Sequence, residues 1–254
     1  MNSYIEYALQ IARRIATARP GVVAVGVGPK VKDGKSAKRA TSIIFYVLDK
    51  TDVVPRWEVL PSYIDVGTPV RPRRIRTDVV QAEQDVSVQA WTEASAGGVY
   101  TWPMPGGGNR RSLISNHVLG ADGVANFEGL EVQVIGRAPK LDAAQVLHGF
   151  LSNNPWLDMD QTVAPMPRAP RTSDKKGRVY LPTQRRWKAV DIFDVHSSPP
   201  GYGDGFILTE PVTNPGDSGS LLIGQDNSPL GFLLGRWAGR SVFSGLQVSI
   251  RALL

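Results

Sequence analysis

A short turn near the end of the chain carries the residues best suited to chemistry. Residues 214–220 read NPGDSGS and directly precede the apolar run 221–223. Flanking glycines let the backbone fold tightly, so the amides of Gly216 and Ser218 can converge on one oxygen while the Ser218 hydroxyl stays accessible. A nucleophile beside such an oxyanion hole is suited to acyl transfer. The alternative interpretation is an ordinary β-turn.

A serine hydroxyl is a weak nucleophile unless a neighbouring base accepts its proton, and histidine is the base suited to neutral pH. The chain has three histidines. His148 lies in the amphipathic stretch 141–150, and His196 precedes a Ser-Ser-Pro-Pro turn, so both have simpler structural explanations. His117 lies near the end of the apolar run 113–119, where a strand end can present its ring to a cleft. We therefore predict that His117 is the base.

Composition narrows the class of protein. The 254 residues allow one large domain or two small ones, and the absence of cysteine excludes disulfides, a thiolate nucleophile and sulfur-ligated zinc. With so few histidines, we expect no metal and no cofactor. The 26 glycines and 19 prolines favour short strands joined by turns, so the chain should be mostly β. No apolar run approaches membrane-spanning length and no secretory signal is evident, so we expect a cytoplasmic protein without membrane contact.

Positive charge is concentrated in the first third of the chain. Residues 1–80 hold 14 Lys or Arg and 7 Asp or Glu, a net charge of +7, whereas the remainder has a net charge of −1. The clusters at 30–39 and 71–76 are most simply a solvated hairpin and a charged linker. An activating protein or another acidic partner is the alternative. No nucleic-acid motif accompanies the clusters, which disfavours nucleic acid as a partner.

The first 85 residues are typical of a small basic α+β domain. Helical spacing of apolar residues predicts a helix over 3–18, and strands are expected at 22–27, 42–48 and 75–80. The first two strands should pair around the turn Lys32–Lys35. Gly26 and Gly28 lead into another strand rather than a helix, which argues against a phosphate-binding loop.

The rest of the chain has a different pattern. Residues 86–96 are polar and small, as in a linker or a first connecting strand. From 97 onward, short apolar runs alternate with turn residues, which indicates a barrel or sandwich. The expected strands of this region are 111–119, 129–134, 161–166, 177–181, 188–195, 206–208, 220–223, 230–234 and 245–250.

On these residues the sequence resembles the chymotrypsin-fold, or trypsin-like, serine peptidases. Leu113–Leu119 and Gly216–Gly219 match the family's histidine and serine motifs, in the same chain order. Leu230–Gly235 looks like the strand that lines the substrate cleft, and Gly245–Ile250 looks like the closing strand before a C-terminal helix. The resemblance covers residues 97–254 and implies a double β-barrel.

The residues before the barrel are similar, more loosely, to the leading module of a bacterial and plant trypsin-like group. The matching signatures are Val25–Gly28 and Thr77–Val80.

The resemblance also implies a triad acid. Asp160 precedes an apolar run as the family's aspartate does, so it is the predicted third member. Asp158 and Asp191 are rivals, and Asp142 or a dyad without an acid stays open. No processed N-terminal amine is evident to pair with Asp217, so that carboxylate is expected to be satisfied internally.

By the same resemblance, the substrate pocket is expected to involve Val212, Thr213, Leu234, Gly235 and Gly245. No carboxylate lies at its floor, so we expect an apolar or small residue before the cut.

Together these features predict a serine endopeptidase that acts on a specific intracellular protein or peptide. His117, Asp160 and Ser218 would form the triad, and the amides of Gly216 and Ser218 would form the oxyanion hole. The alternative is a catalytically silent binding module with the same fold, or an enzyme that becomes active only when a partner docks on residues 1–85.

Overall fold

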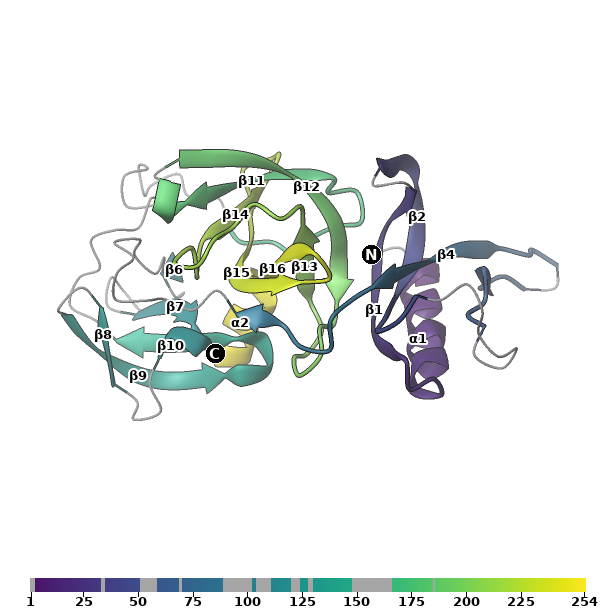
Figure 1. Ribbon diagram of the computed structural model, residues 1–254. Coiled ribbons are helices and arrows are strands. Elements are labelled where there is room, and N and C mark those ends of the chain that lie inside the picture. Colours follow the sequence, from purple (N-terminus) through teal and green to yellow (C-terminus); the bar gives the residue numbers. More distant parts are fainter. Residues whose placement is uncertain are drawn as a thin grey trace.

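The computed structural model describes the chain over ten ranges. These ranges are 3–32, 35–50, 59–68, 70–88, 102–103, 111–119, 124–127, 130–147, 166–184 and 186–254. Over these residues the chain is mostly β, with three sheets and two α-helices (Figure 1). No helix in this part of the chain is long and apolar enough to cross a membrane.

The N-terminal unit is a four-stranded sheet covered by one helix. The sheet has the order β1-β2-β4-β3, with β1 (Val22–Lys32), β2 (Lys35–Val47), β4 (Arg74–Gln81) and β3 (Tyr63–Asp65). Strands β1 and β2 are antiparallel, with Val27 opposite Ile43, while β4 runs parallel to β2. Helix α1 (Ser3–Thr17) buries Ala8, Leu9 and Ala12 against the sheet. These positions follow the helical spacing of the sequence, and the predicted α+β elements are confirmed.

The second sheet has the strand order β6-β7-β10-β9-β8. Its strands are β6 (Trp102–Pro103), β7 (Arg111–Ser115), β10 (Ala143–Leu147), β9 (Leu130–Ala138) and β8 (Val124–Phe127). Strand β10 is antiparallel to β7, with Ala143 opposite Ser115. A short 3-10 helix, η2 (Asn116–Val118), follows β7, and another, η3 (Pro139–Leu141), precedes β10.

The third sheet closes into a barrel. Six strands follow the order β14-β11-β12-β13-β16-β15, and a pairing between β14 and β15 completes the ring. They are β11 (Lys176–Leu181), β12 (Arg186–Ser197), β13 (Phe206–Thr209), β14 (Leu221–Gly224), β15 (Pro229–Trp237) and β16 (Arg240–Gly245), with the 3-10 helix η5 (Pro182–Gln184) after β11. Their inward side chains form a core that includes Val179, Ile207, Leu222, Leu233 and Phe243.

The chain therefore has the predicted fold class of a mostly β protein, with a small α+β unit before a closed six-stranded barrel and a second sheet. A shared apolar cluster joins the two sheets that follow the N-terminal unit. In this cluster Leu113 of β7 packs with Leu221 and Phe232 of the barrel and with Ile250 of the C-terminal helix.

The end of the chain corrects one prediction. Residues 245–250 were expected to form the closing strand, but helix α2 spans Leu246–Leu253 and the closing strand is β16, which ends at Gly245. Leu246, Ser249 and Ile250 are buried on one helix face. Their spacing is helical, but over so few residues it is hard to distinguish from the alternating pattern of a strand. The predicted strand 161–166 lies almost entirely outside the described residues.

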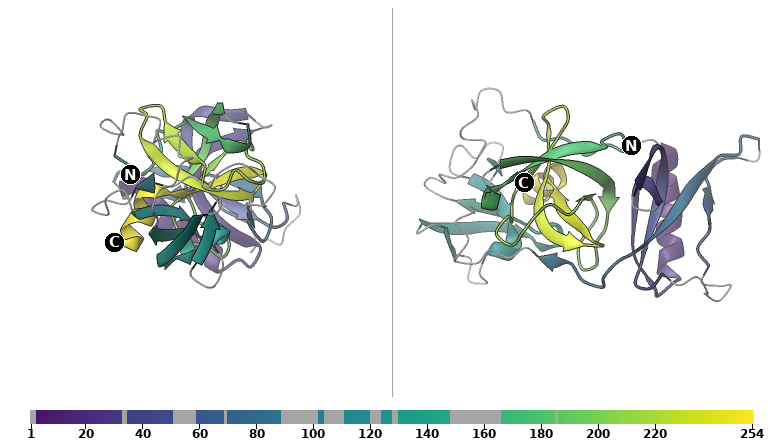
Figure 2. Two further views of the ribbon diagram at one scale, coloured as in Figure 1. Left: turned by 90° about the vertical axis from the view of Figure 1, so that its left-hand side faces the viewer. Right: turned by 45° about the horizontal axis from the view of Figure 1, so that its top comes forward.

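The N-terminal sheet packs directly on the barrel through β1 and β12 (Figures 1 and 2). Asp194 of β12 is buried, and its carboxylate accepts hydrogen bonds from the Val27 amide at 2.9 Å and the Tyr46 hydroxyl at 2.7 Å. Tyr46 also packs against Trp237 of β15 in a tilted arrangement, with ring centroids 4.6 Å apart. A buried polar contact inside an apolar interface therefore fixes the two units against each other.

Gly26 and Gly28 are explained by this interface. A Cβ atom at Gly26 would lie 1.7 Å from Asp194 Oδ2, and one at Gly28 would lie 1.7 Å from the Phe193 carbonyl oxygen. The Gly-Val-Gly pattern thus allows two strands to approach closely, in agreement with the sequence argument against a phosphate loop.

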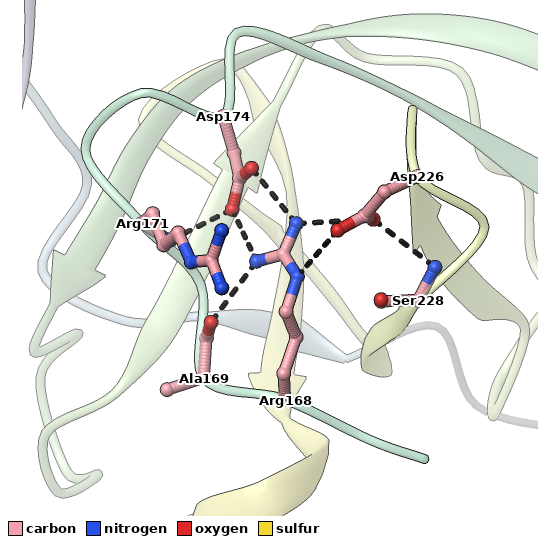
Figure 3. A network of polar contacts seen from close by, with 6 residues as sticks. All are labelled: Arg168, Ala169, Arg171, Asp174, Asp226 and Ser228. Atoms are coloured by element: carbon pink, nitrogen blue, oxygen red, sulfur yellow. Dashed lines mark hydrogen bonds and ion pairs between the residues drawn. The ribbon is translucent and has the colours of Figure 1, made fainter. Parts of the chain in front are cut away.

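A network around Arg168 joins the segment before β11 to the turn after β14 (Figure 3). The guanidinium donates to Asp174 at 2.8 and 2.9 Å and to Asp226 at 2.8 and 3.1 Å. The Arg171 amide also donates to Asp174, at 2.7 Å. This network attaches the segment before β11 to the barrel.

Candidate active site

Ser218 lies in the turn between β13 and β14, and the backbone of that turn is tightly bonded. The Asp217 amide donates to the Asn214 carbonyl at 3.0 Å, and the Ser220 amide donates to the Asp217 carbonyl at 3.0 Å. Gly216 has a φ of 94°, in the left-handed region that only glycine enters readily. The predicted tight turn is therefore present. Its use as an oxyanion hole, through the amides of Gly216 and Ser218, stays a prediction.

The aspartate beside the serine is satisfied from within the chain. The Asp217 side chain is fully buried, and its carboxylate accepts from the Asn214 amide at 2.8 Å. Thr183, in η5, donates to the same carboxylate through its amide at 3.1 Å and its hydroxyl at 2.8 Å. These three donors satisfy the buried carboxylate oxygens and hold the serine turn against η5.

His117 connects the serine to a carboxylate. Its Nε2 lies 2.9 Å from Ser218 Oγ, across 101 residues of sequence. Its Nδ1 lies 2.7 Å from Asp142 Oδ2, and its amide donates to Asp142 Oδ1 at 2.8 Å. The sequence prediction that His117 and Ser218 meet agrees with this geometry. His196 is instead in β12, where its amide donates to Asp194, and His148 lies outside the described residues.

The carboxylate at His117 Nδ1 is that of Asp142, which the sequence analysis had kept only as an open alternative to Asp160. Asp160 and its rival Asp158 lie outside the described residues. Asp191 is an exposed residue of β12, with its carboxylate 3.8 Å from Lys176 Nζ.

Local structure explains why Asp142 reaches the histidine. The end of β7 and the start of β10 lie at the same edge, because these strands are antiparallel neighbours. Asp142 comes directly before β10, and His117 comes two residues after β7. The backbone of Asp142 is left-handed, with φ 50° and ψ 37°, and its carbonyl accepts from the Asn116 amide at 2.8 Å. The strand pairing and this backbone hydrogen bond thus position the two side chains.

The site is shielded from solvent. The His117 side chain is 10% exposed and that of Asp142 is 2% exposed. Burial raises the pKa of Asp142, and the hydrogen bonds from His117 and Asn116 oppose that rise. An acceptor that holds Nδ1–H leaves Nε2 as the lone-pair nitrogen facing Ser218, the tautomer that a general base requires.

The side chains expected to form the substrate pocket lie in different parts of the fold. Val212 is in the barrel core, and Leu234 packs in the apolar cluster with Tyr46 and Trp237, so neither side chain lines an open pocket. Thr213 is buried, with its hydroxyl 2.9 Å from Ser241 Oγ, and its carbonyl accepts from the Arg236 guanidinium.

The two pocket glycines belong to the sheet. Gly235 pairs with Val88 and with Val242. Gly245 donates its amide to the Gly205 carbonyl at 3.1 Å, and a Cβ there would lie 2.6 Å from that oxygen. Close packing therefore explains Gly245, and the composition of the substrate pocket remains a prediction.

No protein-family model and no curated protein matches the chain. The chain is similar to the HtrA-type protease AlgW solved with a decapeptide, with 16% identity, a TM-score of 0.44, and coverage of 94% of this chain and 65% of that one. It is similar to Rv3671c from M. tuberculosis, with 16% identity, a TM-score of 0.41, and coverage of 57% and 74%.

A third similar structure is the MamO protease domain from Magnetospirillum magneticum, with 10% identity, a TM-score of 0.39, and coverage of 92% of this chain and 97% of that one. The three similar structures are chymotrypsin-like serine proteases.

Proposed function

We propose that the protein is a serine endopeptidase with Ser218 as nucleophile, His117 as general base and acid, and Asp142 as the residue that orients His117. The observation that carries the proposal is the continuous contact from Ser218 Oγ to His117 Nε2, at 2.9 Å, and from His117 Nδ1 to Asp142, at 2.7 Å. A nucleophile, a base and an orienting group in that order are the requirements for acyl transfer through a serine.

The reaction would take place in two halves. Nε2 of His117 takes the Ser218 proton as Oγ attacks the scissile carbonyl carbon, and the oxyanion that forms is bound by the amides of Gly216 and Ser218. The imidazolium then protonates the leaving amine, which leaves an acyl group on Oγ. A water molecule, deprotonated by His117, hydrolyses that ester and regenerates the serine. Asp142 stabilises the imidazolium in both halves.

The strand beside the serine turn supports an extended peptide as the substrate. The Leu233 carbonyl of β15 accepts from the Gly219 amide at 3.0 Å, so this strand passes directly beside the serine turn and continues to Trp237. An extended peptide can add to such a strand through main-chain hydrogen bonds, which directs the proposal toward peptide bonds.

The test is covalent labelling of Ser218 by a small alkyl fluorophosphonate. We expect the folded wild-type protein to be labelled and Ser218→Ala to remain unlabelled, since the phosphonate bonds to the activated Oγ. Ser220→Ala is the matched control. Its hydroxyl is buried and has no hydrogen-bond partner among the described residues, so labelling should be unchanged. Absence of labelling in folded wild-type protein would contradict the proposal.

A further inference from the structure

The segment that joins the N-terminal sheet to the rest of the chain is fastened along β15. We call residues 82–88 the tether. Ala82 and Val86 pack in the apolar cluster around Trp237. The Glu83 carbonyl accepts from Trp237 Nε1 at 2.7 Å, and the Glu83 carboxylate accepts from the Ala238 amide at 2.6 Å. The last two residues of the tether, Ser87–Val88, form β5, which is antiparallel to β15.

The direction of the tether leads toward the serine. Glu83 contacts residues 237 and 238, Ser87 is opposite Arg236, and Val88 is opposite Gly235. Leu233 lies two residues before Gly235 in β15, about 7 Å from it at the usual rise of a strand. Leu233 is bonded to both residues that follow Ser218, because its carbonyl accepts from Gly219 and its amide donates to the Ser220 carbonyl at 2.9 Å.

The tether also lies on the side of β15 that faces the serine turn. On that side β14 pairs with β15 as far as Phe232, the serine turn continues the register at Leu233, and β5 follows at Gly235 and Arg236. The opposite side of β15 is occupied by β16. An extended peptide delivered to Ser218 would need the backbone groups of this same stretch of β15.

We propose that the tether is an intramolecular occupant of the substrate-binding edge of β15, so that a substrate chain must displace β5 before it is cut. This inference rests on the proposed function and adds a means of regulating it. A segment of the same chain competes at an effective concentration of roughly millimolar, which is enough to exclude weakly binding peptides. Substrates that bind tightly, or a partner that pulls on the tether, would open the edge.

The test compares two probes on the full chain. A small alkyl fluorophosphonate needs only the triad, whereas tripeptidyl phosphonates ending in Ala, Val or Phe analogues also need the edge of β15. In an antiparallel pair, hydrogen-bonded and non-bonded positions alternate, so one of the two residues of β5 donates its amide to β15. The double variant Ser87→Pro, Val88→Pro removes that amide whether it belongs to Ser87 or to Val88. We expect peptidyl labelling to become at least ten-fold faster, with alkyl labelling unchanged.

Two further variants control for structural effects. Ser87→Ala with Val88→Ala keeps both amides, so the ratio of peptidyl to alkyl labelling should stay at the wild-type value. Glu83→Ala removes the contact with Ala238 without touching β5, and it should raise the ratio two- to five-fold. If the proline variant does not fold, the ratio measured for Glu83→Ala decides whether the tether proposal holds.

The possible failures are distinguishable. Alkyl labelling with an unchanged ratio in the folded proline variant would overturn the tether proposal and leave the proposed function intact. Absence of alkyl labelling in wild type and all variants would instead reject the proposed function, and the tether proposal with it.

Discussion

Asp142 is the residue whose role most needs a direct test. Asp142→Asn keeps the shape of the side chain but favours the wrong histidine tautomer, so we expect alkyl fluorophosphonate labelling to slow by about 10⁴-fold. The matched control is Asp160→Asn, which should change the labelling rate less than about two-fold. The measurement is the second-order rate constant for labelling at pH 7. Slow labelling of Asp160→Asn, with Asp142→Asn unaffected, would instead identify Asp160 as the triad acid.

Some residues of the candidate site could be predicted from the sequence and one could not. Ser218 and His117 could be predicted because a glycine-flanked serine and a strand-end histidine are recognisable locally. Asp142 could not, because its position depends on β7 and β10 being neighbours, which is a tertiary fact. The stretch 141–150 reads as amphipathic, and this obscured the strand that begins at Ala143. An aspartate directly before a strand was the available signal.

At the scale of elements, the Arg168 network should make the barrel sensitive to acid. Arg168 holds the pKa of Asp226 at about 2, below the ordinary value near 4. The stabilisation is therefore complete above pH 4 and is lost as pH falls toward 2. The Asp226 side chain is 47% exposed, so solvent screening limits its contribution to about 1 kcal/mol.

We expect Asp226→Asn to lower the free energy of unfolding by about 1 kcal/mol at pH 7 and to have little effect near pH 1.5, below the folded pKa. Urea unfolding at the two pH values measures this. Asp191→Asn, whose carboxylate is exposed and 3.8 Å from its nearest cation, should have little effect at either pH. A loss for Asp226→Asn that is equal at both pH values would contradict the assignment to the Arg168 ion pair.

Elements were predictable where apolar spacing was distinctive and less so where serine interrupted it. Helix α1 and strand β4 follow their patterns closely, whereas β1 and β2 extend beyond the predicted 22–27 and 42–48 toward the turn that joins them. Strand β16, with the sequence RSVFSG, was missed because its buried serines look polar, although Ser241 and Ser244 are fully buried. Partners within the fold satisfy them, such as the Thr213 hydroxyl beside Ser241.

At the scale of the molecule, the contact between the N-terminal sheet and the barrel should depend on pH through Asp194. Burial raises the pKa of this carboxyl to about 6. The folded protein therefore retains a proton that the unfolded chain loses near pH 4, so stability decreases as pH rises from 4 to 6 and then levels off. A shift of this size corresponds to about 3 kcal/mol.

Asp194→Asn should remove that slope, because an amide does not titrate in this range, while it still offers an oxygen to the Val27 amide. Chemical denaturation between pH 4 and pH 7 compares the two proteins. A wild-type free energy of unfolding that changes with pH no differently from that of Asp194→Asn would show that Asp194 does not couple the interface to pH.

The close approach of β1 to β12 limits how this architecture can be recombined. At Gly28 the obstacle to a side chain is a backbone carbonyl, which cannot rotate away as a side chain can. A hybrid that exchanged the leading eighty residues for those of another protein would need glycine at both positions, or a reshaped barrel strand. The leading sheet is thus built into the body of the molecule and is not an interchangeable attachment.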